Sequence, residues 1–252
     1  MQALTPPLTL ITGASRGIGA ATARLLAARG HDLALNYRRE AAAAQALAEE
    51  LRQLGRRVIC VPADVGDEAE VQQMFERIDA ELGCLTGLVN NAGIVAPAVR
   101  VDEMSVARIE AVFRVNVLGS FLCAKQAILR MSRRHGGPGG AIVNVSSRAA
   151  QLGSPGIYVD YSASKGAIDS FTIGLAREVI GEGIRVNGVR PGIIDTEIHA
   201  SGGMADRIPE AVAGLPIQRL GRADEIAEAI AWLLSDAASY TVGAMLDIGG
   251  GR

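Results

Sequence analysis

Short apolar runs alternate along the chain with longer segments of mixed polarity. The runs hold few charges and many β-branched residues, which is typical of strands that are buried on both faces of a sheet. We expect strands at residues 8–12, 32–36, 57–61, 87–90, 141–145, 184–189 and 244–248.

Apolar residues between these runs recur every three or four positions, the spacing that places them on one face of a helix. The pattern is clearest over residues 71–82, 168–179 and 226–233. Strands that alternate with helices predict right-handed β-α-β units, and therefore an α/β fold: a doubly wound parallel sheet of about seven strands with helices on both faces. Ligands of such a sheet bind beyond the carboxyl ends of its strands.

No break in composition divides the 252 residues, so we expect residues 1–252 to form a single domain. Glycine and proline at residues 136–140 predict a loop. Residues 196–216 hold more glycines and prolines between weak apolar positions. A connection of that length inside a domain is usually functional, and we interpret it as a lid.

Composition excludes several classes of function. The formal net charge is −2 and aromatic residues make up 4% of the chain, so neither a nucleic acid nor a membrane is an expected partner. No apolar run approaches the length that spans a bilayer, and the first residues do not resemble a signal peptide. The three histidines lack the spacing of metal ligands, so no metal is expected.

The three cysteines, Cys60, Cys84 and Cys123, form no CxxC pair and are too few for a disulfide framework. We interpret each of them as a small buried apolar residue. Sparse, unpaired cysteines are typical of a reducing compartment, so we expect the protein in the cytoplasm.

A glycine-rich turn follows the first predicted strand and opens a helix. It reads Thr-Gly-Ala-Ser-Arg-Gly-Ile-Gly over residues 12–19. Glycine lets a pyrophosphate approach the backbone closely, and the free amides and dipole of a helix N-terminus favour negative charge. A turn without a ligand could have the same composition, but its position in a β-α-β unit favours dinucleotide binding.

The chain resembles the short-chain dehydrogenase/reductase family in four ordered motifs that cover essentially its whole length. These are Thr-Gly-x-x-x-Gly-x-Gly at residues 12–19, Asn-Asn-Ala-Gly at 90–93, Tyr-x-x-x-Lys at 161–165 and Pro-Gly at 191–192. The resemblance implies a Rossmann-type fold and an NAD(P)-dependent oxidoreductase of carbonyls and alcohols. The cofactor-binding residues that it implies are Gly13, Ser15, Arg16, Gly17, Ile18, Gly19, Arg38, Asp64, Val65, Asn91, Ala92, Gly93, Tyr161, Lys165, Pro191, Gly192, Ile194 and Thr196.

The choice between NAD and NADP depends on the residues after the second strand. An NAD site usually has an acidic residue there that accepts from the ribose 2′-hydroxyl, whereas residues 36–39 read Asn-Tyr-Arg-Arg. The guanidinium of Arg38, or of Arg16 in the glycine-rich turn, would suit a 2′-phosphate, so we expect NADP(H) rather than NAD(H). The alternative for Arg38 is a solvated residue before a helix. By the same resemblance Asp64 would contact the adenine, unless it caps a helix, a role for which Asp67 is better placed.

Tyr161 is the expected acid/base catalyst. Tyrosine is a weak acid with an ordinary pKa of about 10. Lys165 follows one helical turn later on the same face, and its charge, with that of the oxidised nicotinamide, should lower the pKa of the phenol. Tyr161 would donate a proton to the substrate oxygen in reduction and take one in oxidation. Tyr158 has no such lysine and is expected to line or pack the site.

The resemblance implies two further catalytic residues. Of the pair at the end of the fifth strand, Ser147 is expected to hydrogen-bond the substrate oxygen, and Ser146 to be structural. Asn116, in an apolar helical segment, would hold a water in a proton relay toward Lys165, or else be a satisfied core amide.

The substrate is expected to be a small carbonyl compound or alcohol, bound by residues that follow Ser147 and by the lid. Candidates are Gln151, Leu152, Tyr158, Glu197, His199 and Met204. The resemblance also implies a homotetramer built on two long helices, over roughly residues 105–133 and 161–181.

Two other functions remain as alternatives. One is an NAD-dependent sugar or polyol dehydrogenase. The other is a non-catalytic nucleotide-sensing protein, which would have no need to retain Asn116, Ser147, Tyr161 and Lys165 together. A sugar-nucleotide epimerase would usually show another glycine spacing and a larger C-terminal domain.

Overall fold

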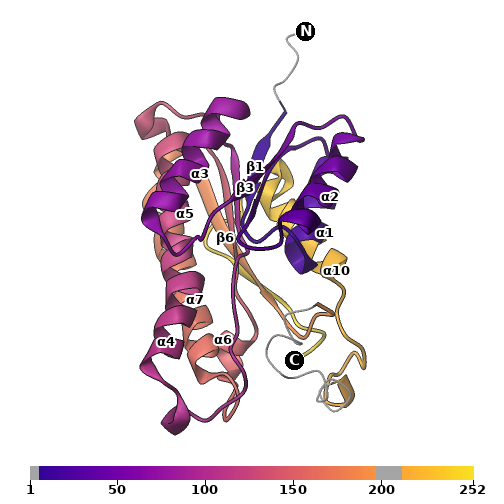
Figure 1. The fold of residues 1–252 in the computed structure, drawn as a ribbon, viewed down its shortest axis with the longest axis vertical. Coiled ribbons are helices and arrows are strands. Elements are labelled where there is room, and N and C mark those ends of the chain that lie inside the picture. The colour runs from indigo at the N-terminus through magenta and orange to yellow at the C-terminus, as the bar shows by residue number, and fades with distance from the viewer. Residues whose placement is uncertain (1–5, 197–211) are drawn as a thin grey trace.

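A parallel sheet of seven strands forms the centre of the molecule in a computed structural model that describes residues 6–196 and 212–252 (Figure 1). The order across the sheet is β3-β2-β1-β4-β5-β6-β7. The winding therefore reverses between β1 and β4, because β4 returns to the free side of β1. The strands are β1 (Leu8–Ile11), β2 (Asp32–Tyr37), β3 (Val58–Pro62), β4 (Gly87–Asn90), β5 (Gly140–Val145), β6 (Ile184–Pro191) and β7 (Met245–Ile248).

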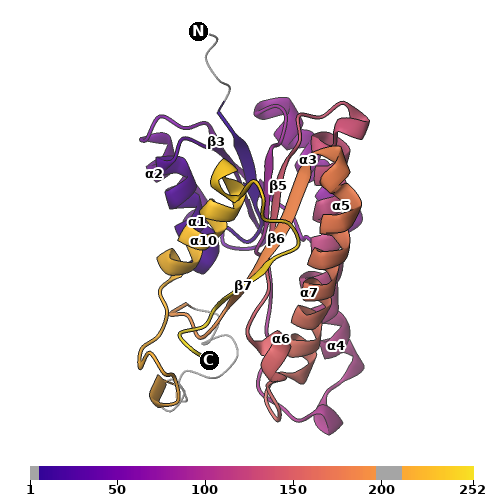
Figure 2. The ribbon, with the colours of Figure 1, turned by 180° about the vertical axis from the view of Figure 1, so that it is seen from behind.

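Helices cover both faces of the sheet, as Figures 1 and 2 show from opposite sides. One face carries α1 (Gly17–Ala28), α2 (Ala41–Arg52) and α10 (Ala223–Leu234). The other carries α3 (Glu68–Glu81), α5 (Gly119–Met131) and α7 (Val159–Val179). Shorter helical segments are η1 (Val101–Glu103), α4 (Val106–Phe113), η2 (Arg114–Leu118), η3 (Arg133–His135), α6 (Ala149–Leu152), η4 (Ile180–Glu182) and η6 (Asp236–Ala238).

Two apolar cores, one on each side of the sheet, hold these layers together. Successive strand residues point to opposite cores, so that Leu10 packs in one and Ile11 in the other. Phe75 of α3 is fully buried in the first core, and Leu26 of α1 and Ile230 of α10 are fully buried in the second. Burial of one such side chain stabilises a fold by about 1.5–3 kcal/mol.

The predicted parallel α/β architecture is confirmed, and Asp67 caps α3 by accepting from the amide of Glu70. The burial expected of the cysteines is wrong for Cys84, which is exposed, whereas Cys60 and Cys123 are buried. The lid expected at residues 196–216 falls mostly within residues 197–211, which lie outside the described part of the chain.

The segments α4, η2 and α5 form one helical run over Val106–Met131. By length and composition alone this run is apolar enough to cross a bilayer, contrary to the expectation that no segment is. In the fold it is a core helix, because Val115, Ala127 and Met131 are buried in the apolar core between it and the sheet.

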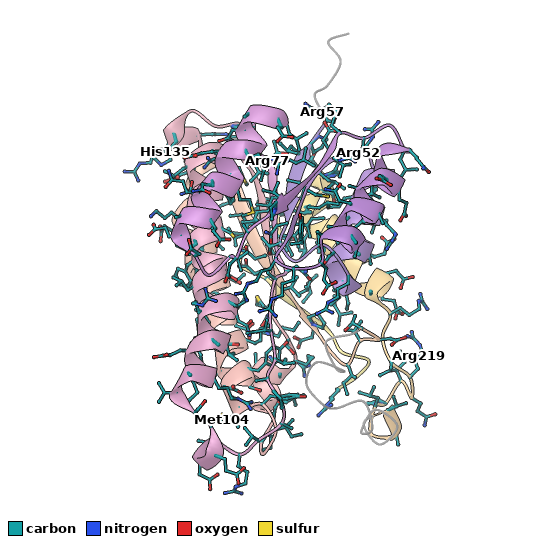
Figure 3. All side chains as sticks on the ribbon, viewed as in Figure 1. Arg52, Arg57, Arg77, Met104, His135 and Arg219 are labelled. Carbon is teal, nitrogen blue, oxygen red and sulfur yellow. The ribbon has the colours of Figure 1, made fainter. Side chains whose placement is uncertain are left out.

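The two ends of the sheet have different surroundings. At the amino end, Arg57 pairs with Asp32 at the start of β2, with an N–O distance of 2.7 Å (Figure 3). At the carboxyl end, the strands run into loops that line a pocket.

Candidate active site

A pocket of about 1010 Å³ lies at the carboxyl ends of the strands, across the point between β1 and β4 where the winding reverses. Ligands of doubly wound sheets bind at such a point. The predicted residues that line the pocket are Gly13, Ser15, Arg16, Gly17, Ile18, Arg38, Asp64, Val65, Asn91, Ala92, Gly93, Ser147, Tyr161, Lys165, Pro191, Gly192, Ile194 and Thr196.

The glycine-rich turn has a shape that requires glycine. Gly13 and Gly17 have φ angles of +61° and +54°, which other residues rarely adopt. At Gly19, a Cβ would lie 2.5 Å from the carbonyl oxygen of Gly13 and 2.7 Å from Nδ2 of Asn91. Gly19 does not line the pocket and is closely packed beneath the turn, so its contact with the cofactor stays a prediction.

Three polar side chains brace the turn. Nδ2 of Asn91 donates to the carbonyl oxygens of Thr12 and Gly13 at 2.9 and 3.0 Å. Oγ1 of Thr12 accepts from the amides of Asn91 and Ala92, each at 3.0 Å. Oδ1 of Asn36 accepts from the amide of Gly13 at 3.2 Å. The hydrogen bonds of Thr12 and Asn36 at the turn were not predicted. The sequence feature that could have indicated them is a polar residue at the end of an apolar strand.

This arrangement fits the pyrophosphate of a dinucleotide. Gly17 and Ile18 bring the N-terminus of α1 to the pocket, where the helix dipole and unpaired amides favour an anion. The first turn of α1 contains no acidic residue, and no side chain caps it. The chemistry of this N-terminus therefore matches a phosphate group.

Asp64 lies between two arginines in the part of the pocket next to β2 and β3. Its Oδ2 atom is 3.0 Å from Nη2 of Arg38 and 2.9 Å from Nη2 of Arg114, and its Oδ1 accepts from the amide of Gly66 at 3.0 Å. Burial alone would raise the pKa of this carboxyl, but the Gly66 amide and the two guanidiniums outweigh burial and lower it. The helix-capping alternative for Asp64 is excluded, since Asp67 caps α3.

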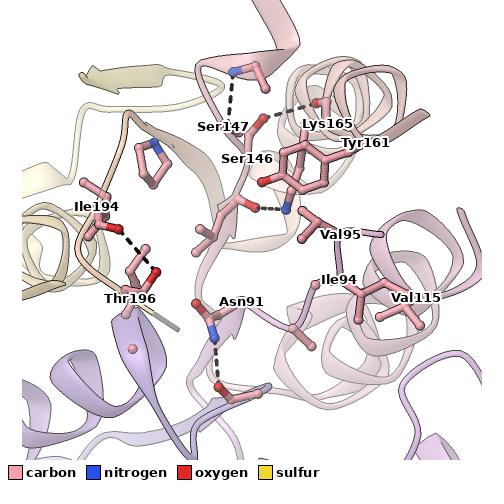
Figure 4. A pocket seen from close by; sticks show the side chains of 18 of the residues that line it. Asn91, Ile94, Val95, Val115, Ser146, Ser147, Tyr161, Lys165, Ile194 and Thr196 are labelled. Atoms are coloured by element: carbon pink, nitrogen blue, oxygen red, sulfur yellow. Dashed lines mark hydrogen bonds between the residues drawn. The ribbon is translucent and has the colours of Figure 1, made fainter. Parts of the chain in front are cut away.

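Tyr161 and Lys165 lie together on α7, beside the end of β5 (Figure 4). Nζ of Lys165 is 5.7 Å from the centroid of the Tyr161 ring and donates to the carbonyl oxygen of Val145 at 2.7 Å. Lys165 is only 4% exposed, so its amine is fixed in a nearly dry position. Tyr158 lines the pocket as expected and lies edge-on to Tyr161, with ring centroids 6.5 Å apart.

Burial favours the neutral form of both catalytic candidates. It raises the pKa of Tyr161, and a side-chain hydrogen bond with Ser147 opposes this rise. It lowers the pKa of Lys165 to about 8, and the charge of Asp169 opposes this fall. In the chain by itself, burial outweighs the hydrogen bond with Ser147, so a lowered pKa for Tyr161 is not found there and stays a prediction for the complex with the oxidised cofactor.

The two serines after β5 have different surroundings. Ser147 interacts with Tyr161 at the pocket, and its Oγ accepts from the amide of Ala149 at 3.1 Å (Figure 4). Ser146 is buried, and its hydroxyl donates to Oδ1 of Asp169 at 2.6 Å. Ser147 therefore lies beside Tyr161 at the pocket and Ser146 forms a structural bond, and the catalytic role of Ser147 stays a prediction.

Asp169, the partner of Ser146, begins a series of ion pairs that crosses the sheet. Asp169 pairs with Arg190 of β6 at 2.8 Å, and Arg190 pairs with Asp247 of β7 at 3.1 Å. Asp247 also pairs at 2.6 Å with Arg148, which lines the pocket. This network was not predicted, because its members are far apart in sequence and each alone resembles a solvated charge.

Asn116 lies in the π-helical turn η2, is buried and does not line the pocket. Its Oδ1 accepts from the amide of Ile94 at 2.8 Å, and its Nδ2 donates to the carbonyl of Ile94 and to Oγ of Ser164, each at 3.0 Å. Its side chain is therefore a satisfied core amide. A Cβ at Gly93 would lie 3.4 Å from Oδ1 of Asn116 and 3.6 Å from Nζ of Lys165, so both side chains lie close to Gly93. The relay role stays a prediction.

The expected substrate residues divide into three groups. Leu152 and Tyr158 line the pocket, whereas Gln151 accepts a hydrogen bond from Arg148 and does not. Glu197, His199 and Met204 lie outside the described residues. Unpredicted lining residues include Ile94, Val95, Ile157 and Ile193, whose apolar side chains look like core residues in the sequence.

The chain is similar to known oxidoreductases over nearly its whole length. The family described as enoyl-(acyl carrier protein) reductase matches residues 13–252. The chain is 51% identical to the uncharacterized oxidoreductase YgfF of Escherichia coli (strain K12), over 97% of this chain and 99% of that protein. It is 42% identical to cis-4-hydroxycyclohexanecarboxylate dehydrogenase of Sinomonas cyclohexanicum, over 99% and 98% of the two chains. Its fold is similar to that of a short chain dehydrogenase from Burkholderia cenocepacia J2315 in complex with NADP, with a TM-score of 0.87, 38% identity and 97% of each chain covered.

Proposed function

The chain belongs to the short-chain dehydrogenase/reductase family, whose members are NAD(P)-dependent oxidoreductases, and we propose that it prefers NADP(H) and uses Tyr161 as its acid/base catalyst. The observation that carries the proposal is the pair of Tyr161 and Lys165, which shares one pocket with the glycine-rich turn.

Tyr161 moves a proton at its hydroxyl in this proposal. Its hydroxyl and that of Ser147 interact at the pocket, so both are available to one substrate oxygen. The nicotinamide, when bound, supplies a hydride in reduction and accepts one in oxidation. In reduction Tyr161 gives its proton to the substrate oxygen, and the ammonium of Lys165, fixed by the carbonyl of Val145, stabilises the phenolate that remains. In oxidation the phenolate takes a proton from the substrate hydroxyl.

Arg38 and Arg16 support the preference for NADP(H). Both are exposed and line the pocket, and a guanidinium can bond two phosphate oxygens at once. The position near the end of β2 has Asn36 rather than a carboxylate, and its amide is already bonded to Gly13 and to the carbonyl of Ala63. Residues 36–39, at the end of β2 and just after it, include no acidic residue.

The substrate that we propose is a secondary alcohol on a small ring, or the corresponding ketone. The similar protein of Sinomonas cyclohexanicum is named for a ring alcohol of this kind. The residues that line the pocket include Ile94, Val95, Leu152 and Ile157, whose apolar side chains suit the carbon faces of a ring.

We further propose that the protein acts in the cytoplasm as a homotetramer. Its three cysteines are free thiols, as a reducing compartment would keep them. Closed symmetric assembly is the common form of soluble oligomers.

Tyr161→Phe tests the catalytic assignment. The variant should lose turnover by at least about 100-fold, because the proton donor is removed. Its Kd for NADPH should stay close to that of the wild type, because the ring remains. Turnover is measured with NADP+ and a panel of cyclic alcohols that includes cis-4-hydroxycyclohexanecarboxylate, and binding by NADPH fluorescence. Turnover that survives the substitution would contradict the acid/base role.

Parallel titrations of the wild type with NADPH and NADH test the cofactor assignment. Tighter binding of NADPH supports Arg38 and Arg16 as phosphate ligands. Tighter binding of NADH overturns that assignment and favours an NAD-dependent sugar or polyol dehydrogenase. Binding of neither nucleotide favours a protein without catalytic function.

A further inference from the structure

Arg114 does not line the pocket, yet it is bonded to a carboxylate that does. We propose that Arg114 is a positioning residue for cofactor choice: it holds Asp64 and so leaves the charge of Arg38 available to a 2′-phosphate. This inference rests on the proposed preference for NADP(H), and it adds a residue on which that preference depends.

The contact is built by two segments that are distant in sequence. Arg114 is the first residue of the π-helical turn η2, and Asp64 follows β3. The side chain of Arg114 passes over Gly66, where a Cβ would lie 2.9 Å from both its Cγ and its Nη1. Any larger residue at position 66 would displace Arg114, so the glycine there permits the contact.

One carboxylate oxygen serves two guanidiniums. Oδ2 of Asp64 is 2.9 Å from Nη2 of Arg114 and 3.0 Å from Nη2 of Arg38. Of the two arginines, Arg38 is among the residues that line the pocket and Arg114 is not. A ligand in the pocket can therefore compete for Arg38 while Arg114 keeps its bond to Asp64.

The burial of Asp64 makes that second partner necessary. The side chain of Asp64 is 10% exposed, whereas those of Arg38 and Arg114 are 49% and 40% exposed. A nearly buried carboxylate without a cation is strongly unfavourable. If Arg38 were its only cation, turning Arg38 toward a phosphate would weaken the compensation of Asp64. Because Arg114 stays bonded to Asp64, Arg38 can leave Asp64 at a smaller cost in free energy.

The charges of Arg38, Asp64 and Arg114 lead to the same conclusion. Two guanidiniums and one carboxylate leave one unit of positive charge more than Arg38 and Asp64 alone would. The nearby carboxylate of Glu70, which accepts from the amide of Asp64 at 2.7 Å, is the same in both cases. A phosphate monoester carries a charge of about −1.5 to −2 near pH 7. The ribose hydroxyl of NADH is uncharged, so the net charge of the cluster acts on NADPH and hardly on NADH.

Arg114→Gln measures this effect without any substrate. The variant should bind NADPH at least about fivefold more weakly, with a much smaller change for NADH, as expected of a coupling between two sites. Arg114→Lys keeps the charge and should retain most of the preference. The matched control is Arg24→Gln, which breaks the exposed Arg24–Glu50 pair away from the pocket and should leave both Kd values unchanged.

Variants of Asp64 make the test sharper. In Asp64→Asn/Arg114→Gln the carboxylate that Arg114 would hold is gone, so the ratio of the two Kd values should return toward that of the wild type. Asp64→Asn alone should raise the preference for NADPH, since Arg38 then has no carboxylate beside it. If Asp64 also contacts the adenine, Asp64→Asn loses that contact with NADPH and NADH alike. The loss therefore cancels in the ratio of the two Kd values.

Each outcome decides between defined alternatives. Equal weakening of NADPH and NADH by Arg114→Gln, or no weakening, overturns the inference and leaves Arg114 a structural residue. If Arg114→Gln does not fold, Asp64→Asn decides, and a lower preference for NADPH overturns the inference. A wild type that binds NADH as tightly as NADPH overturns the proposed cofactor and this inference together. A wild-type preference that Arg114→Gln leaves unchanged overturns the inference alone.

Discussion

A buried lysine beside the half-buried Tyr161 is costly to the fold. Lys165 is 4% exposed, and its pKa is lowered from 10.5 to about 8. A depression of this size corresponds to about 3 kcal/mol of unfavourable burial of the charged form. The residue that we propose to stabilise the phenolate therefore destabilises the folded chain at neutral pH.

The stability of Lys165→Met relative to the wild type should depend on pH. Below pH 8 the wild type carries the full cost of the buried charge, because Lys165 is protonated in both the folded and the unfolded chain. Between pH 8 and 10.5 the folded chain releases the proton while the unfolded chain keeps it, so the wild type gains stability with rising pH. The variant should therefore lose about 2 kcal/mol relative to the wild type between about pH 7.5 and 9.5.

Chemical denaturation at several pH values measures this difference. Lys125→Met is the control, since Lys125 forms an exposed pair with Glu68 and should show no comparable pH dependence. A constant difference between Lys165→Met and the wild type over this range would contradict the depressed pKa.

Local motifs predicted the residues that lie close together in sequence. Tyr161 and Lys165 share one helix face because four residues make about one turn, and Ser147 follows a strand whose direction is set by its neighbours. Arg114 and Asp169 could not be predicted in this way. Their partners, Asp64 and Arg190, come from other elements, and only the packed fold brings them together.

At the scale of elements, the start of α1 is a tightly packed part of the site. Gly19→Ala would place a Cβ 2.5 Å from the carbonyl oxygen of Gly13, so the turn must shift. We expect a loss of stability of about 1–3 kcal/mol, as overpacking usually causes. NADPH should bind at least about tenfold more weakly, because the turn and the N-terminus of α1 move together.

The control for this prediction lies on the same helix. Ala28→Gly at the exposed end of α1 should cost about 1 kcal/mol through helix propensity alone and leave the Kd for NADPH unchanged. Both variants are compared by thermal melting and by NADPH titration. Equal affinities in Gly19→Ala and Ala28→Gly would show that the packing at Gly19 does not shape the binding turn.

Elements with a clear period were predictable, and irregular ones were not. Each strand was expected within two residues of its observed bounds, since buried parallel strands are short, apolar and separated by helices. The π-helical turn η2 interrupts the run Val106–Met131, and one wide turn changes the apolar period too little to be seen in the sequence. Yet this turn carries both Arg114 and Asn116.

At the scale of the whole molecule, one exposed apolar face lacks a cover within the described chain. Leu118, Phe121 and Leu129 of the run Val106–Met131 and Ile173 of α7 are exposed large apolar residues. Phe121 is 47% exposed and stacks on Phe171 of α7, with ring centroids 3.9 Å apart. These helices are the ones expected to pair in a homotetramer, and an exposed apolar face suits such an interface.

Phe121→Asp should therefore reduce the assembly to dimers or monomers, because a charge would be buried between subunits. Light scattering coupled to size-exclusion chromatography measures the mass, and circular dichroism checks the fold. Leu54→Asp is the control, since Leu54 is also an exposed apolar residue but lies after α2, on the other side of the sheet. An unchanged mass for Phe121→Asp would exclude this face as an interface.

The bond between Asp64 and Arg114 also joins the two halves of the chain that meet at β1 and β4. Arg38 and Asp64 come from the half with the glycine-rich turn, whereas Arg114 comes from the half with Tyr161. A gene recombined at β4 would thus inherit Arg38, the proposed ligand of the 2′-phosphate, from one parent and Arg114, its proposed positioning residue, from the other. The preference for one cofactor would then not be transferred with the first half of the chain alone. A chimaera that takes its first half from another parent must also take residue 114 from that parent.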